Sequence, residues 1–145
     1  MRALLQRVTH ARVCVAGECV GEIERGLLVL LGLDKGDDQA AVQRMLDKLL
    51  AYRVFPDEDG RMNCSVSDVA GGVLLVSQFT LSADTRKGLR PSFSSAMPPD
   101  QAQRLYEHML QCLQQRHQPV AAGVFAADMQ VSLTNDGPVT FLLEV

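Results

Sequence analysis

The sequence predicts an α+β fold in which two main helices pack on one curved, barrel-like sheet of antiparallel or mixed strands. Two observations predict this class. Short β-rich runs separated by glycine turns fill the first third of the chain and return at its C-terminal end, whereas two stretches between them have the 3.6-residue period of amphipathic helices. Because no linker, repeat or low-complexity segment interrupts the 145 residues, we expect residues 1–145 to form a single domain.

The first third of the chain is expected to be an antiparallel meander. Residues 3–8 and 12–16 form its first strands, with His10 in a turn between them. A turn at Gly17-Glu18 leads to residues 19–23, and the apolar run 27–33 is typical of a buried strand.

Two later stretches are predicted to be helices. The first begins after Asp37 or Asp38, which are favourable N-cap residues, and ends near Arg53. The second begins at Pro99, a residue favoured in the first helical turn, and ends before Pro119. Each has one apolar face, formed by Val42, Met45, Leu46, Leu49 and Leu50 in the first helix and by Ala102, Leu105, Tyr106, Met109, Cys112 and Leu113 in the second.

The rest of the chain is divided between loops and strands. Residues 56–60 are typical of a turn, and residues 61–72 and 83–97 are predicted to be loops. Residues 73–79 form a buried strand, and residues 127–133 and 139–145 form two more. Since Asp136-Gly137 lies between the last two apolar runs, we expect a hairpin there.

The composition excludes several classes of protein. No apolar run approaches the roughly 20 residues that span a bilayer, and the N-terminus lacks the features of a secretory signal. The four cysteines are too few and too irregular for a disulfide scaffold or a zinc site, so we expect thiols in a reducing cytoplasm. No metal or other cofactor and no membrane partner is expected.

Charge and aromatic content limit the possible contacts with nucleic acid. The formal net charge is −3, and only seven residues are aromatic, five Phe and two Tyr. Wrapping along a duplex or a long single strand needs more positive charge and more stacking surface than this. DNA is therefore not an expected partner, whereas a small contact with one end of an RNA remains compatible with the sequence.

No standard catalytic motif occurs in the chain. A serine, cysteine or threonine nucleophile needs an adjacent base, and only His10, His108 and His117 offer an imidazole. We expect all three to be solvated surface residues. The motifs of α/β-hydrolases, zinc proteases and nucleotide-binding loops are missing.

Two unusual segments remain as candidates. In Ser77-Gln78-Phe79-Thr80-Leu81 a strand leaves the sheet, where successive backbone N–H groups can point at a developing oxyanion. The alternative is a strand edge with its polar groups in water. In the second segment, residues 135–140, a proline follows a glycine, and the alternative there is an ordinary trans turn.

Together these segments resemble the D-aminoacyl-tRNA deacylase family. The strings SQFTL at residues 77–81 and NDGPVT at residues 135–140 match the family pattern in order and separation. The resemblance extends over essentially the whole chain, through LLQRV near its start and through GLLVLLG, AYRVFPDEDGRMN, RPSFS and FAADMQVSL. It implies the same α+β fold and an enzyme of translation quality control.

The resemblance implies a homodimer that hydrolyses the ester between a D-amino acid and the terminal adenosine of tRNA. The Gly137-Pro138 bond would be cis, and this element would enter the partner's pocket and exclude L side chains. Such an exclusion filter would let glycyl-tRNA through, because glycine has no side chain to exclude. Arg7 would brace the element; a surface contact with phosphate is the alternative for Arg7.

The resemblance also implies roles on the opposite wall. The catalytic group would be Gln78, Phe79 and Thr80, with Ser77 beside the substrate and the N–H groups of Phe79 and Thr80 facing the oxyanion. Because no base is identifiable to activate the Thr80 hydroxyl, a 2′-hydroxyl of the tRNA is preferred as the group that positions water. Three more residues would line the pocket, although Met129 fits the core equally well: Ala102, Phe125 and Met129.

A short basic segment follows the first motif. Arg86, Lys87 and Arg90 are close enough to it to reach phosphates of the acceptor end, or else they belong to a solvated loop. Two other functions stay open at this point. One is a non-catalytic dimer that binds an RNA end or a small ligand, and the other is an ester hydrolase with Thr80 as its nucleophile.

Overall fold

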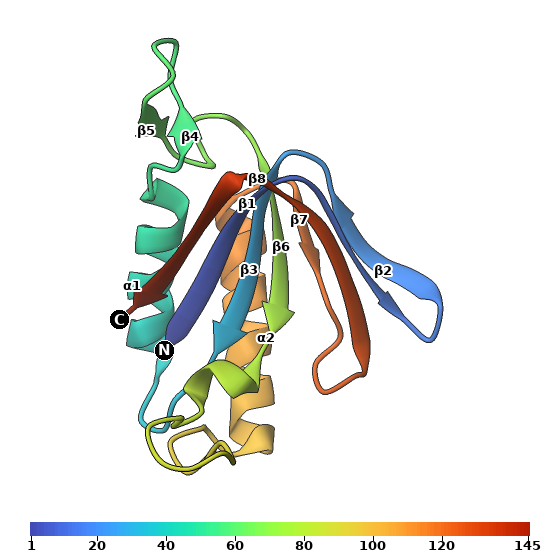
Figure 1. The fold of residues 1–145 in the computed structure, drawn as a ribbon, viewed down its shortest axis with the longest axis vertical. Coiled ribbons are helices and arrows are strands. Elements are labelled where there is room, and N and C mark those ends of the chain that lie inside the picture. Colours follow the sequence, from blue (N-terminus) through green and yellow to red (C-terminus); the bar gives the residue numbers. More distant parts are fainter.

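One mixed, six-stranded sheet forms the centre of the molecule in the computed structural model, which describes residues 1–145. Its strand order is β2-β1-β3-β6-β7, and β8 pairs with β1 (Figure 1). β1 is antiparallel to β2, β3 and β8, whereas β3–β6 and β6–β7 are parallel pairs, so the predicted fold class is confirmed. The strands are β1 Arg2–Val15, β2 Glu18–Ile23, β3 Gly26–Gly32, β6 Gly72–Ser77, β7 Val120–Ala122 and β8 Met129–Glu144.

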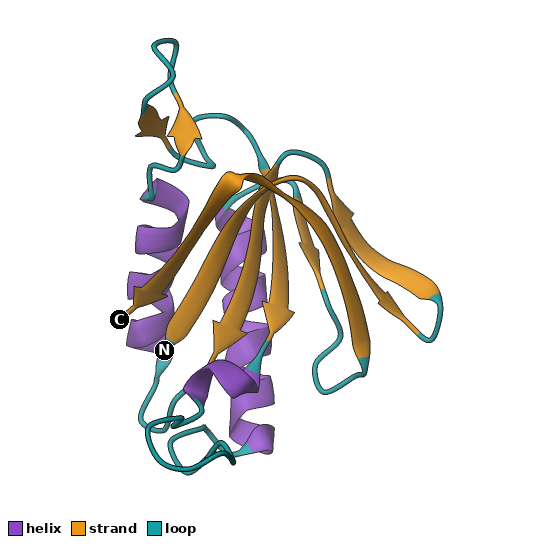
Figure 2. Cartoon of the chain, in the orientation of Figure 1, coloured by secondary structure: helices purple, strands orange, loops and turns teal.

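Both helices cover one face of this sheet (Figure 2). α1 spans Gln39–Ala51, and its N-cap Asp38 accepts a hydrogen bond from the N–H of Ala41 at 2.8 Å. α2 spans Pro99–Arg116 and begins at the predicted proline. A core of 24 buried residues lies mainly between these helices and the sheet, and a second cluster of seven lies against β1, β2, β3 and β6. The periodicity therefore predicted both helices and the faces that they bury.

β1 is one continuous strand, so the predicted turn at His10 is wrong. The first half of β1, Arg2–Val8, pairs with β3, and its second half pairs with β2 from Ala11 onward. β8 runs along the other side of both halves. The strand continues through His10 because β3 and then β2 pair with one edge of β1, while β8 pairs with its other edge.

Several short elements were not predicted from the sequence. β4 (Phe55–Pro56) and β5 (Met62–Cys64) form a small hairpin around the predicted turn, so residues 62–64 are not a loop. The buried strand ends at Ser77, and a 3₁₀ helix, η1, follows at Phe79–Ser82. Strands of two or three residues carry too little periodicity to be recognised.

The predicted hairpin at Asp136-Gly137 is wrong, because these residues lie within one strand, β8, which pairs with β1 on both sides of them. Gln6 faces Thr140 and Val8 faces Asn135, so the four residues Asp136–Val139 stand opposite Arg7 alone and form a large bulge. The Asn135 side chain holds the bulge: its Oδ1 accepts from the N–H of Val139 at 3.0 Å, and its Nδ2 donates to Thr140 Oγ1 at 2.8 Å. The Gly137-Pro138 bond within it is cis, as the resemblance implied.

The sheet curves until its ends almost meet. A Cβ on Gly21 of β2 would lie 2.7 Å from the carbonyl oxygen of Ala122 in β7, although the two strands share no ladder. Inside the sheet, β3 and β6 approach even more closely where Gly26 faces Gly72.

No helix in the structure combines the length and the apolar character needed to cross a membrane. All four cysteines are free thiols, as expected.

Candidate functional site

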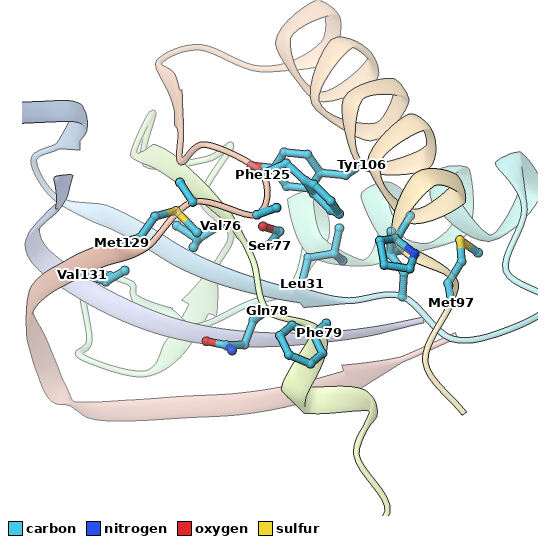
Figure 3. A pocket seen from close by; sticks show the side chains of 15 residues that line it. Leu31, Val76, Ser77, Gln78, Phe79, Met97, Tyr106, Phe125, Met129 and Val131 are labelled. Carbon is cyan, nitrogen blue, oxygen red and sulfur yellow. The ribbon is translucent and has the colours of Figure 1, made fainter. Parts of the chain in front are cut away.

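A cavity of about 450 Å³ lies where β3 and β6 end, beside the start of α2 (Figure 3). Twelve of its fifteen lining residues are hydrophobic. Tyr106 and Phe125 pack together on one side, with ring centroids 5.8 Å apart, and Gln78 and Phe79 lie on the other. The cavity is therefore an apolar chamber with a polar strand end at its edge.

Six of the predicted site residues meet at this cavity. They come from β6 and the residues after it, from α2 and from the segment that leads into β8: Ser77, Gln78, Phe79, Ala102, Phe125 and Met129. Met129 thus lies in the wall, although its side chain also packs against the smaller core cluster. The sequence did not indicate Leu31, Leu33, Met97 and Tyr106 as site residues, because an apolar side chain in sequence indicates only burial.

The strand end exposes two backbone donors. The N–H of Gln78 donates a hydrogen bond to the carbonyl oxygen of Leu31 at 2.7 Å. The first hydrogen bond of the 3₁₀ helix runs from the N–H of Leu81 to the carbonyl oxygen of Gln78 at 3.2 Å. The N–H groups of Phe79 and Thr80 fall between these bonds and have no partner. Two neighbouring N–H groups of this kind can hold an oxygen that gains negative charge.

Thr80 lies beside the cavity and does not line it. Its Oγ1 accepts a hydrogen bond from Gln78 Nε2 at 2.6 Å, and no carboxylate or imidazole contacts it. The geometry therefore provides no base that would remove the hydroxyl proton.

None of the three histidines lines the cavity. His10 Nε2 lies 2.6 Å from Glu22 Oε1, and His108 Nε2 lies 3.6 Å from Cys112 Sγ. The expectation of a solvated surface is wrong for His117, which is 8% exposed and whose Nε2 lies 2.7 Å from the carbonyl oxygen of Gly71. It is buried because it follows directly after α2, where the chain turns back to the sheet.

Arg7 clamps the bulge of β8. Its Nη1 donates to the carbonyl oxygen of Val54 at 2.6 Å, its Nε donates to the carbonyl oxygen of Asp136 at 3.1 Å, and the Asp136 carboxylate lies 3.3 Å from Nε. Gly137 and Pro138 are exposed beside it. The guanidinium joins two segments and holds the start of the bulge in place.

This bulge is remote from the cavity of its own chain. Arg7 faces Leu27, which is four residues from the cavity residue Leu31 along β3. At about 3.3 Å per residue the separation along the strand is roughly 13 Å. The structure therefore does not bring Arg7, Gly137 and Pro138 together with Ser77 and Phe79 within one chain.

The loop after η1 carries the predicted cations. The Arg86 guanidinium donates two hydrogen bonds to the Asp84 carboxylate, of 2.8 and 2.9 Å, and the Arg86 backbone N–H donates a third at 3.0 Å. These bonds hold the pKa of the Asp84 carboxyl well below its usual range. Lys87 and Arg90 are exposed and have no ion pair. They are the two cations in this loop that remain free to contact an anion.

Tyr106 connects the cavity wall to the sheet. Its hydroxyl donates to the carbonyl oxygen of Leu75 at 2.9 Å, and burial raises the pKa of Tyr106 to about 12. In the unfolded chain a tyrosine ionises near pH 10. The stability that the buried, neutral Tyr106 contributes is therefore complete below about pH 10 and is lost as the pH rises to about 12.

We expect the free energy of unfolding in urea to fall between about pH 10 and about pH 12, and to fall less in Tyr106→Phe. In a Tyr52→Phe background, tyrosinate absorbance should show ionisation well above pH 10; ionisation at pH 10 would contradict the assignment.

Comparisons with known proteins identify the family of the chain. Residues 4–144 match a family model described as D-Tyr-tRNA(Tyr) deacylase. The chain is 61% identical over 145 residues to the D-aminoacyl-tRNA deacylase of Cellvibrio japonicus, covering 100% of this chain and 99% of that relative. It is 62% identical over 144 residues to the enzyme of the same name from Stutzerimonas stutzeri, covering 99% of each.

Two solved structures are also similar. A structure described as c-Myc DNA unwinding element binding protein is 44% identical and superposes with a TM-score of 0.96, covering 100% of this chain and 99% of that one. A probable eukaryotic D-amino acid tRNA deacylase superposes with a TM-score of 0.86 at 16% identity, over 99% and 98% of the two chains, and shows a shared fold. Because the family model and relatives at about 60% identity extend over nearly the whole chain, the protein belongs to the D-Tyr-tRNA(Tyr) deacylase family.

Proposed function

We propose that the protein hydrolyses the ester bond of D-aminoacyl-tRNA and releases free tRNA and the D-amino acid. Membership of the family supports this activity. The structural observation that carries the proposal is the apolar cavity at the end of β6, with the unpaired N–H groups of Phe79 and Thr80 at its edge. The proposed place of action is the cytoplasm, where tRNA is charged and used.

The proposed chemistry uses few side chains. The terminal adenosine and the amino acid occupy the cavity, and the ester carbonyl oxygen accepts hydrogen bonds from the N–H groups of Phe79 and Thr80. Water, positioned by the neighbouring 2′-hydroxyl of the ribose, adds to the carbonyl carbon. The C–O bond to the ribose then breaks, and the ribose oxygen takes up the proton that the attacking water gives up. The two N–H groups stabilise the charge that develops on the carbonyl oxygen, which is often the largest contribution to such catalysis.

Selection against L-amino acids is assigned to Gly137 and Pro138 of a second copy. Within one chain the bulge is roughly 13 Å along the strand from the cavity, so it can serve a cavity only in a neighbour. A symmetric dimer would give each cavity one such element. The Arg7 clamp supports this role, because a filter based on exclusion must be rigid. Sedimentation should show a dimer at micromolar concentration; a monomer that is fully active would contradict this arrangement.

The decisive experiment compares three charged tRNAs. We expect D-tyrosyl-tRNA to be cleaved, L-tyrosyl-tRNA to resist, and glycyl-tRNA to be cleaved because it has no side chain to exclude. If no D-aminoacyl-tRNA is hydrolysed but the RNA end still binds, the protein is the alternative, a non-catalytic binding dimer. If glycyl-tRNA resists as strongly as L-tyrosyl-tRNA, the selection is not by exclusion.

Thr80→Ala is expected to keep substantial activity, because the substitution retains the backbone N–H. Loss of a covalent nucleophile would instead reduce the rate by several orders of magnitude. Single-turnover hydrolysis of D-tyrosyl-tRNA measures the difference, with circular dichroism to verify folding. A terminal 2′-deoxyribose should abolish hydrolysis in both proteins. Near-complete loss in a folded Thr80→Ala protein would favour the other alternative, an ester hydrolase with a threonine nucleophile.

Binding to DNA, which the description of one similar structure states for that protein, has less support here. The formal net charge of −3 provides little general attraction for a duplex. The free cations Lys87 and Arg90 lie in one loop, and such a local pair fits a contact with one RNA end.

A further inference from the structure

An exposed aromatic pair lies at the mouth of the cavity. Phe79 is 61% exposed and Phe93 is 40% exposed, and their ring centroids are 5.1 Å apart with the planes inclined by 53°. Phe79 lines the cavity, whereas Phe93 does not. Phe93 therefore extends the apolar surface from the cavity outward, with a large part of its ring open to solvent.

The backbone around Phe93 is well fixed. The neighbouring Ser92 exchanges two hydrogen bonds with Asp84, of 2.8 and 3.0 Å, which close the loop at its base. The carbonyl oxygen of Phe93 accepts from the N–H of Ala96 at 3.0 Å, and the Ser95 hydroxyl donates to the carbonyl oxygen of Ser82. The ring is thus presented by a closed loop that is tied to η1.

The same loop is locally positive. Residues 85–91 contain Arg86, Lys87 and Arg90 and no carboxylate, although the chain as a whole carries a net charge of −3. Of the three, Arg86 is paired with Asp84, and the other two are free. An exposed aromatic ring next to free cations is the combination that holds single-stranded nucleic acid, since the base stacks and the phosphates are neutralised.

The size of the cavity limits how much of the RNA strand it can hold. A cavity of about 450 Å³ has the size of a site for one drug-sized ligand, and the proposed function places the terminal adenosine with its amino acid there. The RNA strand must then leave through the mouth. The first base outside the cavity belongs to the penultimate nucleotide.

We infer that Phe93 is a stacking site for the base of the penultimate nucleotide of the tRNA acceptor end, with Lys87 and Arg90 holding the adjoining phosphates. Phe79 braces one side of the ring, and the base covers the part that is exposed. This inference rests on the proposed function and adds a binding site for the RNA strand outside the catalytic cavity.

The test compares two substrates of different length. With D-tyrosyl-tRNA, Phe93→Ala is expected to lower kcat/KM by about 5- to 100-fold, mainly through KM, because stacking on one ring contributes roughly that factor. With 3′-O-D-tyrosyl-adenosine, which lacks the penultimate nucleotide, the same variant should act like the parent protein. On tRNA, Phe93→Tyr should keep the kcat/KM of the parent protein, and Phe93→Leu should lose about as much as Phe93→Ala, since leucine fills the space without an aromatic face.

Two controls make the outcome decisive. An abasic penultimate nucleotide in D-tyrosyl-tRNA should weaken the parent protein as much as Phe93→Ala does, and should not weaken that variant further. Met62→Ala, which alters an exposed apolar residue of β5, should leave kcat/KM unchanged for both substrates. Equal loss on both substrates would show that Phe93 only supports Phe79, and no loss on tRNA would also overturn the inference. Failure to cleave either substrate would instead contradict the proposed function.

Discussion

Gly26→Ala is expected to leave almost no folded protein. A Cβ on Gly26 would lie 1.9 Å from the carbonyl oxygen of Gly72 and 2.6 Å from its nitrogen, and both are backbone atoms of the parallel partner strand. β3 cannot move away, because β1 pairs with its other edge and both of its faces are buried. Ordinary overpacking costs about 1–3 kcal/mol. Here the pairing of two central strands must break, in a domain whose total stability is on the order of 5–15 kcal/mol.

Gly36→Ala is the matched control. Gly36 has a φ of +90°, and no atom lies within 4 Å of the Cβ that alanine would add. The expected cost is about 1–2 kcal/mol from the left-handed backbone alone. Circular dichroism and urea denaturation should show that Gly36→Ala is folded and that Gly26→Ala is unfolded. If Gly26→Ala is folded and unfolds at nearly the same urea concentration as the parent protein, the close approach of β3 and β6 is not as the structure has it.

Arg7→Ala is expected to weaken both the fold and the choice of enantiomer. The carbonyl oxygens of Val54 and Asp136 lose a charged donor, and the Arg7 side chain is only 12% exposed, so the cost is about 2–3 kcal/mol. In the proposed arrangement, a bulge without its clamp can move and admit L side chains into the partner's cavity. We expect the ratio of kcat/KM for D-tyrosyl-tRNA to that for L-tyrosyl-tRNA to fall by at least about tenfold, which corresponds to about 1.4 kcal/mol of discrimination.

Two further variants separate the clamp from simple loss of charge. Arg7→Lys keeps the charge, but an ammonium group lacks the planar fork that bonds both carbonyl oxygens, so its selectivity should also fall. Arg12→Ala removes an exposed arginine of the same strand that makes no ion pair, and it should behave like the parent protein. An Arg7→Ala protein that is less stable but fully selective would assign Arg7 to the fold alone.

The elements that the sequence predicted correctly are those with local signals. α1 has a capping aspartate and a full apolar face, and α2 has a proline at its start and a longer face of the same kind. Such periodicity is independent of distant partners. The continuity of β1 through His10 depends instead on β2, β3 and β8, which are supplied by three other parts of the chain.

The bulge shows why a strong local signal can mislead. Asp136-Gly137 is typical of a hairpin, yet Asn135 supplies side-chain bonds to Val139 and Thr140, and the strand continues along β1. Tertiary pairing outweighs turn propensity here. The predicted motif residues 77–79 do meet at the cavity, whereas Leu31 and Tyr106 were missed because burial and cavity lining look alike in sequence.

The bulge also affects how the chain behaves toward other copies of itself during synthesis and storage. β8 is an edge strand of 16 residues, and a long, flat edge of this kind is a template for uncontrolled strand addition. The bulge divides that edge into two short runs, and Pro138 offers no N–H group to an incoming strand. A sequence that straightened residues 136–139 would therefore lose resistance to fibril formation as well as the element that we propose selects against L-amino acids.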